Sequence, residues 1–270
     1  MYKYKFSKCG MLILVLGMVF AACQKMTRPN LGNFPKDTNP PGGPLKFFAA
    51  LDGSSVDSIR ANFGTDNNVT YVQGVSGQAA TFDQTNKGFI SWPSANDLGS
   101  QTDFSVSLWF NAGDTSKKDH NNADGMLAFA RSSDFWGNIT IFADHETSTS
   151  DSMRLTIVLV GNFLGHDGPK RIPHMYDNKW HHLAVTYQNS DSTYTLYIDG
   201  SQWEQHTIPQ IHFIDPNVLV LGGFQQAASV QGTYADNSWM SPFGGALDQL
   251  RLFGVVLSAA DVQALYTNKH

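Results

Sequence analysis

The sequence predicts an all-β domain built as a sandwich of two antiparallel sheets. Short apolar or alternating runs recur from Leu45 onward, and turn-forming residues separate them. Helical periodicity is almost absent before the C-terminus, and about 225 residues are enough to bury one large core. Regular short strands along one long domain are typical of a two-sheet sandwich. We therefore expect a single β-sandwich domain over residues 45–270.

The first 22 residues are expected to be an export signal. Three lysines precede an apolar run over residues 10–20, which is too short to span a bilayer, and Ala21 and Ala22 form a small-residue cleavage site. The string 20–23, FAAC, resembles a bacterial lipobox, although Phe20 replaces the commoner leucine. The resemblance implies that Cys23 becomes a lipidated first residue in a Gram-negative envelope, in the outer membrane on its surface or periplasmic face. An ordinary cleaved signal beside a free cysteine is the alternative.

Residues 23–44 are expected to be the lipidated cysteine and a flexible tether. They contain five prolines and three glycines without apolar periodicity. Loss of the signal leaves Cys23 as the one cysteine, so no intrachain disulfide can form. It also leaves 15 basic against 23 acidic residues, a net charge of about −8, which argues against nucleic acid as a partner.

At least eleven segments are predicted as strands: Phe47–Leu51, Val69–Gln73, Gly88–Trp92, Phe104–Asn111, Gly125–Arg131, Asn138–Phe142, Met153–Val160, His182–Tyr187, Tyr194–Ile198, Val218–Leu221 and Ala246–Phe253. The pair at 182–187 and 194–198 alternates with period 2, as expected for half-buried strands. The dipeptide Asp199-Gly200 readily adopts positive φ and predicts a second hairpin. Near the end, Ser258 and Asp261 predict a capping box, with Leu257 packing on Val262 at the start of a short helix.

Several strings resemble the laminin-G-like domains of the concanavalin A-like lectin/glucanase superfamily. They are WHHLAVTY at 180–187, LYIDG at 196–200, FGGALDQLRLF at 243–253 and LSAAD at 257–261, with weaker echoes at 80–83 and 103–110. The resemblance covers roughly residues 45–268 and implies a jelly roll with a short closing helix. The functions of this family are diverse, so the fold does not fix the function.

The number and spacing of the acidic residues indicate whether the protein can be a hydrolase. Glycosidases of this fold use a pair of acids about 5 Å apart on one strand. The chain has two glutamates, Glu146 and Glu204, in unrelated segments, and no E-x-D-x-E string. Hydrolysis by the usual route is therefore not expected, and an atypical carboxylate pair in a hydrolase or lyase is kept as an alternative. The nine histidines lack ligand spacing and are expected to be ordinary hydrogen-bonded residues rather than zinc ligands.

A structural calcium ion is the one metal that the resemblance implies. In related jelly rolls such an ion ties the first strand to the last, and Asp248 has the family position in the last strand. Asp52 follows the first strand, and calcium accepts carboxylate together with backbone oxygens. The alternative is that Asp248 accepts hydrogen bonds from backbone amides at a sheet edge.

Two tryptophans in polar loops are the best candidates for ligand binding. A sugar has an apolar C–H face and a polar rim, so a site needs an aromatic platform beside amides and carboxylates. The strings FWGN and DNSWM provide Trp136 with Asn138, and Asn237 with Trp239; Tyr234 lies in the same long loop as the second string, together with Gln225 and Gln226. Trp109 and Trp180 are expected to be structural. The prediction is a non-catalytic binder of a polysaccharide or glycoprotein glycan, with a protein-binding adhesion module as a further alternative.

Overall fold

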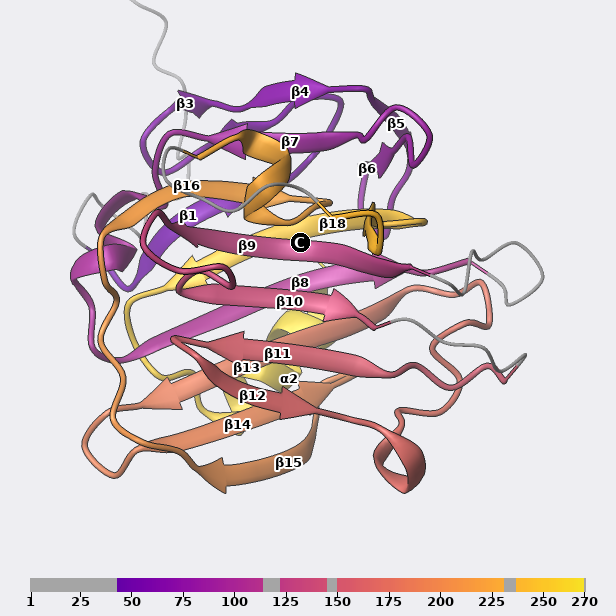
Figure 1. The fold of residues 1–270 in the computed structure, drawn as a ribbon. Helices are drawn as coiled ribbons and strands as arrows, with labels where there is room; N and C mark the ends of the chain where they lie inside the picture. Colours follow the sequence, from indigo (N-terminus) through magenta and orange to yellow (C-terminus); the bar gives the residue numbers. More distant parts are fainter. Residues whose placement is uncertain (1–42, 114–121, 145–149, 231–236, 270) are drawn as a thin grey trace, which may run out of the picture. The chain divides into compact units, whose positions relative to one another are not determined.

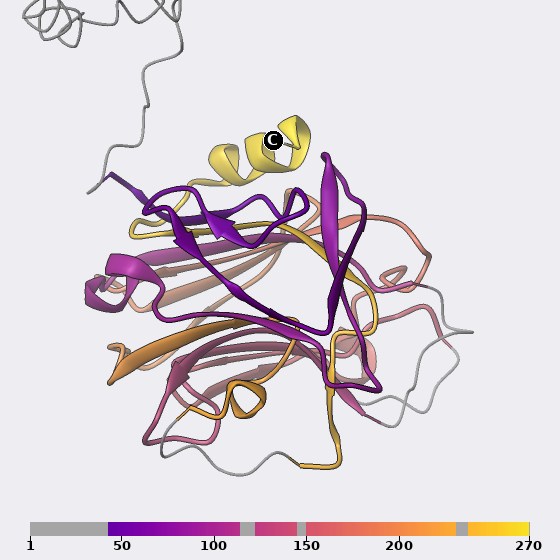
Figure 2. The same ribbon diagram turned by 90° about the horizontal axis from the view of Figure 1, so that it is seen from above.

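The computed structural model describes residues 43–113, 122–144, 150–230 and 237–269, which form a β-sandwich (Figure 1). The predicted export signal, Cys23 and most of the predicted tether lie outside these residues. Two sheets, A and B, face each other, and a helix lies against the outer side of sheet A (Figure 2). In the part of the chain that is described, no helix is both long and apolar enough to cross a membrane.

Sheet A contains ten strands: β1 (Leu45–Ala49), β2 (Val56–Asp57), β3 (Asn62–Phe63), β5 (Val69–Gln73), β6 (Gln78–Phe82), β8 (Phe104–Asn111), β13 (His181–Gln188), β14 (Thr193–Ile198), β15 (Ser201–Thr207) and β18 (Ala246–Phe253). Their order is β15-β14-β13-β8-β18-β1-β2-β3. In addition, β6 pairs with β18 on one side and with β5 on the other. The last long strand therefore lies between β1 and β8, in the middle of the sheet.

Sheet B contains eight strands: β4 (Thr65–Asn67), β7 (Phe89–Trp92), β9 (Ala123–Arg131), β10 (Ile139–Ala143), β11 (Leu155–Leu159), β12 (Asn162–Gly165), β16 (Pro216–Leu221) and β17 (Met240–Pro242). Their order is β12-β11-β10-β9-β16-β7-β4, and the short β17 pairs in parallel with β9. Every other pairing is antiparallel. Three short helical turns, η1 (Asn96–Ser100), η2 (Gly168–Lys170) and η3 (Gln225–Ala228), lie in connecting segments.

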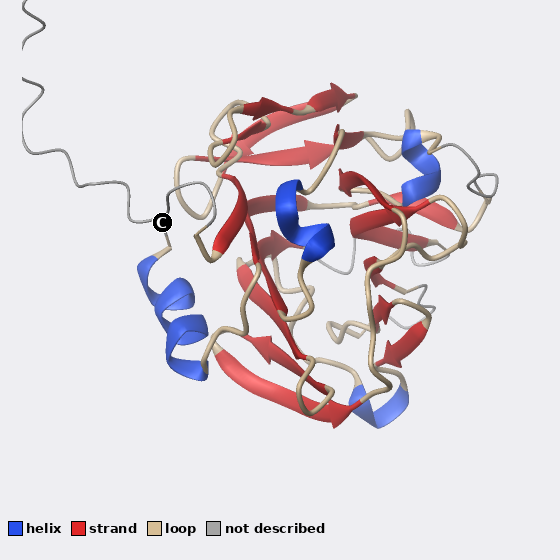
Figure 3. Cartoon of the chain, turned by 90° about the vertical axis from the view of Figure 1, so that its left-hand side faces the viewer, coloured by secondary structure: helices blue, strands red, loops and turns tan. Residues whose placement is uncertain are grey.

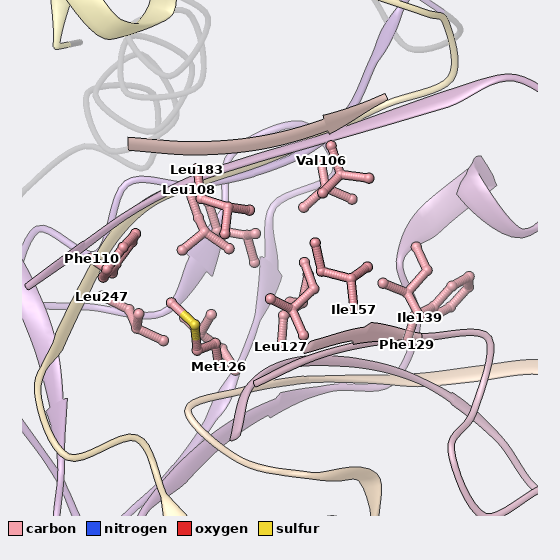
Figure 4. Packing of buried hydrophobic residues seen from close by; sticks show 14 of the residues in the cluster. Val106, Leu108, Phe110, Met126, Leu127, Phe129, Ile139, Ile157, Leu183 and Leu247 are labelled. Carbon is pink, nitrogen blue, oxygen red and sulfur yellow. The ribbon is translucent and has the colours of Figure 1, made fainter. Parts of the chain in front are cut away.

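The core lies between the two sheets. Side chains that alternate along β8 and β13, such as Val106, Leu108 and Leu183, point toward Leu127 and Ile157 of sheet B (Figure 4). All five are fully buried. Burial of a large apolar side chain contributes about 1.5–3 kcal/mol, so this layer provides most of the stability of the described residues, which contain no cysteine.

The hairpin β13–β14 is buried on both faces, which corrects the expectation of half-buried strands. Leu183 and Val185 point into the core, as predicted, but Ala184 on the opposite face is also inaccessible to solvent. The physical reason is that Val262 of the C-terminal helix packs on Ala184. The turn into β15 has positive φ at both Asp199 and Gly200, as the sequence predicts.

The C-terminal helix α2 (Ala259–Asn268) begins at the predicted capping box (Figure 3). The side chain of Ser258 accepts a hydrogen bond from the amide of Asp261, and the Asp261 carboxylate accepts one from the amide of Ser258. Leu257 packs against the cluster that contains Val262, as expected for the predicted staple. The ring of Tyr266 stacks on Trp109 at 5.5 Å, so Trp109 is structural, as predicted.

Candidate functional site

A cavity of about 640 Å³ opens on the outer face of sheet B. Alternation along two neighbouring strands creates its floor: Ile141 and Ile157 point into the core, while Phe142 and Thr156 lie opposite each other on the outer face. We call it the aromatic cavity, and its lining residues are Trp136, Phe142, Asp144, Arg154, Thr156, Phe163, Gly165 and Trp239. Its volume lies within the usual range for small-molecule sites.

Four aromatic rings form one wall of the aromatic cavity. Trp136 stacks on Phe142 with centroids 5.5 Å apart and an interplanar angle of 11°. The ring of Phe163 stands edge-on to Trp136 at 5.1 Å, and Trp239 lies 5.9 Å from Trp136. Phe163 is 55% exposed, whereas Phe142 is buried. The two predicted loop tryptophans therefore converge, and Phe142 and Phe163 join them.

Buried glutamine side chains fix the loop that carries Trp136. The Gln225 amide donates to the carbonyl oxygens of Asp134 and Phe135, and the Gln226 amide donates to the carbonyl of Phe135. Asp134 in turn accepts a hydrogen bond from the amide of Trp136 at 2.9 Å. Gln225 and Gln226, which the sequence placed beside Tyr234 as possible loop contacts, therefore position the tryptophan.

The second tryptophan directly precedes β17, which pairs with β9. The carbonyl of Trp239 accepts a hydrogen bond from the amide of Ala123, and the next residue, Met240, begins β17. Phe224 packs edge-on against Trp239 at 5.8 Å. These contacts attach both tryptophans to the sheet, so the aromatic wall is preorganised.

A charged edge borders the aromatic wall. The Arg154 guanidinium lies 3.4 Å from the Asp144 carboxylate and 3.5 Å from that of Asp167. Thr156 donates to the same Asp144 carboxylate at 3.4 Å. The cavity thus combines an aromatic surface with hydroxyl, carboxylate and guanidinium groups, which can form hydrogen bonds to a polar ligand.

The other predicted ligand residues do not all join the site. Asn138 is fully buried, and its side chain bonds the carbonyls of Ala130 and Ile214 and the amide of Ile214. These three bonds occupy its amide, so its assignment as a ligand contact is wrong. Asn237 is partly buried, and its carbonyl accepts from the amide of Met240. Tyr234 lies outside the described residues.

A second cavity of about 320 Å³ adjoins the first. We call it the edge cavity, because it lies where the edge strand β12 of sheet B meets the edge strand β15 of sheet A; its lining residues are Phe163, Leu164, Gly165, Lys170, Glu204, His206, Thr207 and Ile208. Phe163 and Gly165 line both cavities.

Glu204 links two histidines beside the edge cavity, an arrangement that the sequence analysis missed. One carboxylate oxygen lies 2.8 Å from Nε2 of His166, and the other lies 2.8 Å from Nε2 of His206. Glu204 and His206 are two residues apart on β15, a spacing that could have placed both on one face. The partner His166 is distant in sequence and had no such signal. Among the described residues, no cluster of three His, Cys, Asp or Glu side chains is arranged to hold a metal ion.

The geometry around Asp248 suits the expected calcium only in part. One oxygen of its buried carboxylate accepts from the amides of Val75 and Ser76, as the alternative reading predicted, while Oδ1 has no hydrogen-bond partner. Burial, together with the like charge of Asp52, raises the pKa of Asp248 to about 7. A cation bound here would contact the unpaired Oδ1 atom of Asp248 and would reduce the repulsion between Asp248 and Asp52. Carboxylate oxygens are also the ligands that calcium prefers.

A profile of the concanavalin A-like lectin/glucanase superfamily matches residues 83–263, more than half of the chain. The chain belongs to the concanavalin A-like lectin/glucanase superfamily. The sequence resemblance is thereby confirmed, and so is the predicted all-β sandwich with its short C-terminal helix. A search of curated proteins found no match.

Solved structures share this superfamily fold at low sequence identity. Domain 4 of the GH43 extracellular arabinanase AbnA from Geobacillus stearothermophilus, solved with arabinotriose, has a TM-score of 0.58 and 20% identity over 83% of this chain and 98% of its own. The binding domain of botulinum neurotoxin DC in complex with SialylT gives a TM-score of 0.57 and 10% identity over 84% of this chain. Botulinum neurotoxin type C, whose cell entry depends on interaction with two ganglioside molecules, has a TM-score of 0.59 and 11% identity over 84% of this chain. This chain spans about half of each toxin structure.

Hydrolases of this fold use two carboxylates that face one glycosidic bond, so the carboxylates that line the aromatic cavity matter for the function. Among the described lining residues, Asp144 is the one carboxylate, and it is paired with Arg154. Glu204 lines the neighbouring edge cavity, where both of its oxygens contact histidines. Glu146 lies outside the described residues.

Proposed function

We propose that this protein binds carbohydrate without catalysing a reaction, and that the aromatic cavity holds a polysaccharide or glycoprotein glycan. The convergence of Trp136 and Trp239 with Phe163 carries the proposal. A sugar ring can lay its apolar C–H face on such a wall while its hydroxyls meet Asp144 and Arg154.

Two further observations support a glycan over other ligands. The wall is half-buried and fixed to the sheet, so binding requires little ordering of side chains. The related arabinanase domain was solved with arabinotriose, and botulinum neurotoxin type C interacts with gangliosides. Both proteins share the fold of this chain, and each combines it with a sugar-containing ligand.

Binding rather than hydrolysis is proposed because of the state of the carboxylates near the wall. A retaining or inverting glycosidase needs two carboxyl groups facing one glycosidic bond, one of them able to act as an acid. Asp144 is held by Arg154 and Thr156 at the edge of the cavity. Such an environment suits a hydrogen-bond acceptor for hydroxyls.

The proposal is tested by a glycan-array screen of the purified protein and of two variants, Trp136→Ala and Phe163→Ala. We expect binding to a defined glycan class and a loss of about tenfold or more in each variant, since a central aromatic contact commonly contributes that much. Phe163→Ala is the cleaner variant, because the ring is 55% exposed on an edge strand and its loss leaves the core intact.

Trp203→Ala is the matched control, because Trp203 is 41% exposed on β15 and does not line either cavity. Unchanged binding in this control, with weakened binding in the other two, supports the aromatic cavity as the site. Glycan fragments released by the wild-type protein would favour the hydrolase or lyase. Failure of every glycan, together with tight binding of a protein partner, would favour an adhesion module.

We further propose that Cys23 carries a lipid anchor that holds the domain in the cell envelope, with the residues up to 44 as a tether. A structural calcium ion bound by Asp248 and Asp52 is proposed to tie β18 to the segment after β1. The proposed calcium ion lies apart from the carbohydrate site, because the Asp248 carboxylate belongs to sheet A and the aromatic cavity lies on sheet B.

A further inference from the structure

The aromatic cavity and the edge cavity form one continuous groove. Phe163 and Gly165, neighbours on the outer face of β12, line both. The aromatic cavity alone crosses β10, β11 and β12, and adjacent strands lie about 4.8 Å apart, so it extends roughly 10 Å across the sheet. The edge cavity continues this path past β12, which makes the groove longer than one sugar ring needs.

The rim of this groove carries ion pairs and one further cation among the described residues. Arg154 and Arg171 both contact Asp167, and Arg154 also contacts Asp144. Lys170 lines the edge cavity, and no ion-pair partner for it occurs among the residues that the structure describes. Lys170 is therefore a cation that the described part of the rim does not pair, on a chain whose net charge is −5.

Glu204 is paired with two histidines rather than with Lys170. His166 is 1% exposed, and its Nδ1 atom lies 2.8 Å from the carbonyl oxygen of Leu155. Its Nε2 atom lies 2.8 Å from one oxygen of Glu204. His206 contributes a further N–H to the other oxygen of Glu204.

We propose that the edge cavity is a subsite for an acidic sugar unit, a uronic or sialic acid whose carboxylate faces Lys170. This inference rests on the proposed carbohydrate function and deepens it. The neutral part of the oligosaccharide lies on the aromatic wall, crosses Phe163 and Gly165, and presents its carboxylate to the uncompensated cation. Like a rim charge at other interfaces, Lys170 selects among glycans more than it adds to the affinity for all of them.

Two matched pairs of oligosaccharides test the proposal by isothermal titration calorimetry. One pair is xylotetraose with and without a glucuronic acid branch, and the other is lacto-N-neotetraose with and without terminal sialic acid. We expect the acidic member of one pair to bind about five- to tenfold more tightly than its neutral counterpart, the range for an exposed charged hydrogen bond. The pair that shows the difference distinguishes uronic from sialic acid.

Lys170→Gln should remove this preference and leave the affinity for the neutral member unchanged. Lys179→Gln is the control, because it removes the same charge from a 76% exposed lysine outside the groove. Gly165→Val should also abolish the preference by blocking the passage between the cavities. A Cβ at this position meets only the Thr156 hydroxyl, at 3.7 Å, so the strand can accept the substitution.

The outcomes separate this inference from the proposed function. Equal binding of neutral and acidic members, or equal weakening of both by Lys170→Gln, would overturn the acidic subsite and leave carbohydrate binding standing. If neither member of either pair binds, the acidic subsite is contradicted, and the proposed function is contradicted as well only if every glycan on the array also fails to bind. A preference that persists in Lys170→Gln would also overturn the assignment to the edge cavity.

Discussion

Adjacent histidines at the start of β13 have opposite electrostatic environments. His182 faces the outer side of sheet A, where burial, helped by the charge of Arg251, lowers its pKa to about 4. His181 faces the other way and contacts Asp199 and Asp177 at 2.9 and 3.0 Å. Burial alone would lower the pKa of His181, but these two carboxylates outweigh burial and raise it. Below the ordinary histidine pKa, the shift of His181 favours the folded state, whereas the shift of His182 disfavours it.

We predict that His182 increasingly destabilises the folded state as the pH falls from about 6.5 to 4, whereas the raised pKa of Asp248 favours the folded state over the same range. In the unfolded chain His182 gains a proton near pH 6.5, whereas in the folded chain it does so near pH 4. The unfolded state therefore binds more protons in this range, and the loss is at most about 3 kcal/mol. In urea unfolding, the free energy of unfolding of His182→Gln relative to wild type should rise by up to about 3 kcal/mol as the pH falls over this range.

His174→Gln is the control for this measurement, because the His174 side chain is 74% exposed. It should retain the wild-type slope of unfolding free energy against pH. A His182→Gln variant with the full wild-type slope would contradict the assignment of the pH effect to the buried ring.

The calcium proposal predicts that Ca²⁺ raises the melting temperature. A ligand at 100 times its dissociation constant adds about 2.7 kcal/mol, and in a domain of this size each kcal/mol corresponds to about 2–4 °C. Asp248→Asn should abolish the shift, because it removes the charge beside the unpaired oxygen. The control Asp191→Asn, in the exposed β13–β14 turn, should keep it. An equal shift in both variants would mean that calcium binds elsewhere.

Single residues show both the strength and the limit of the sequence analysis. Trp136 and Trp239 could be predicted because an aromatic residue among Gly, Asn and Ser in a loop is often exposed. Asn138 has the same neighbours, yet its side chain turns inward to bond backbone groups of Ala130 and Ile214. Composition does not specify the direction of a side chain, so the two cases looked alike in the sequence.

Among the elements, short strands and strands with polar side chains were the ones that the sequence did not reveal. All eleven predicted strands correspond to observed ones, whereas β2, β3, β4, β6, β12 and β17 were missed, and β15 was expected only as the second arm of a hairpin. Nearly all side chains of β15 are exposed. An edge strand with polar side chains has no apolar alternation by which the sequence could reveal it. β12 and β15 border the edge cavity, and the sequence did not indicate that these two strands meet, so that cavity was missed as well.

The closing helix gives a prediction for a single element. Ser258→Ala removes the capping box of α2 and should lower the free energy of unfolding by about 1 kcal/mol. Glycan affinity should not change, because α2 packs on sheet A and the aromatic cavity lies on sheet B. Chemical denaturation and a binding titration on the same variant check both parts. A large loss of affinity would show that the helix and the groove are coupled.

In the whole molecule, the strand order could not be derived from periodicity alone. Period 2 identifies strands but not their neighbours, and β18 pairs with both β1 and β8 across most of the chain length. The superfamily resemblance provided the sandwich architecture that local patterns lacked. The pairing of Trp136 with Trp239 likewise depends on the parallel contact between β17 and β9, which leaves no local trace in the sequence.

The proposed anchor predicts where the whole protein resides. In a Gram-negative host the wild-type protein should partition with membranes and carry a lipid on Cys23, detectable by mass spectrometry of its N-terminal peptide. Cys23→Ala should release the protein into the soluble envelope fraction, with the fold unchanged. A Cys9→Ala control should behave like wild type. Membrane association that persists in Cys23→Ala would contradict the lipid anchor.

The central claim is tested most directly by the tryptophan indole signals of the ¹⁵N-labelled protein in a titration with a glycan selected from the array. Trp→Phe variants assign the signals. We predict that the indole resonances of Trp136 and Trp239 shift together and saturate at one dissociation constant, while those of the buried Trp92 and Trp109 stay fixed. Shifts confined to Trp203, or saturating binding that leaves Trp136 and Trp239 unchanged, would contradict the aromatic cavity as the carbohydrate site.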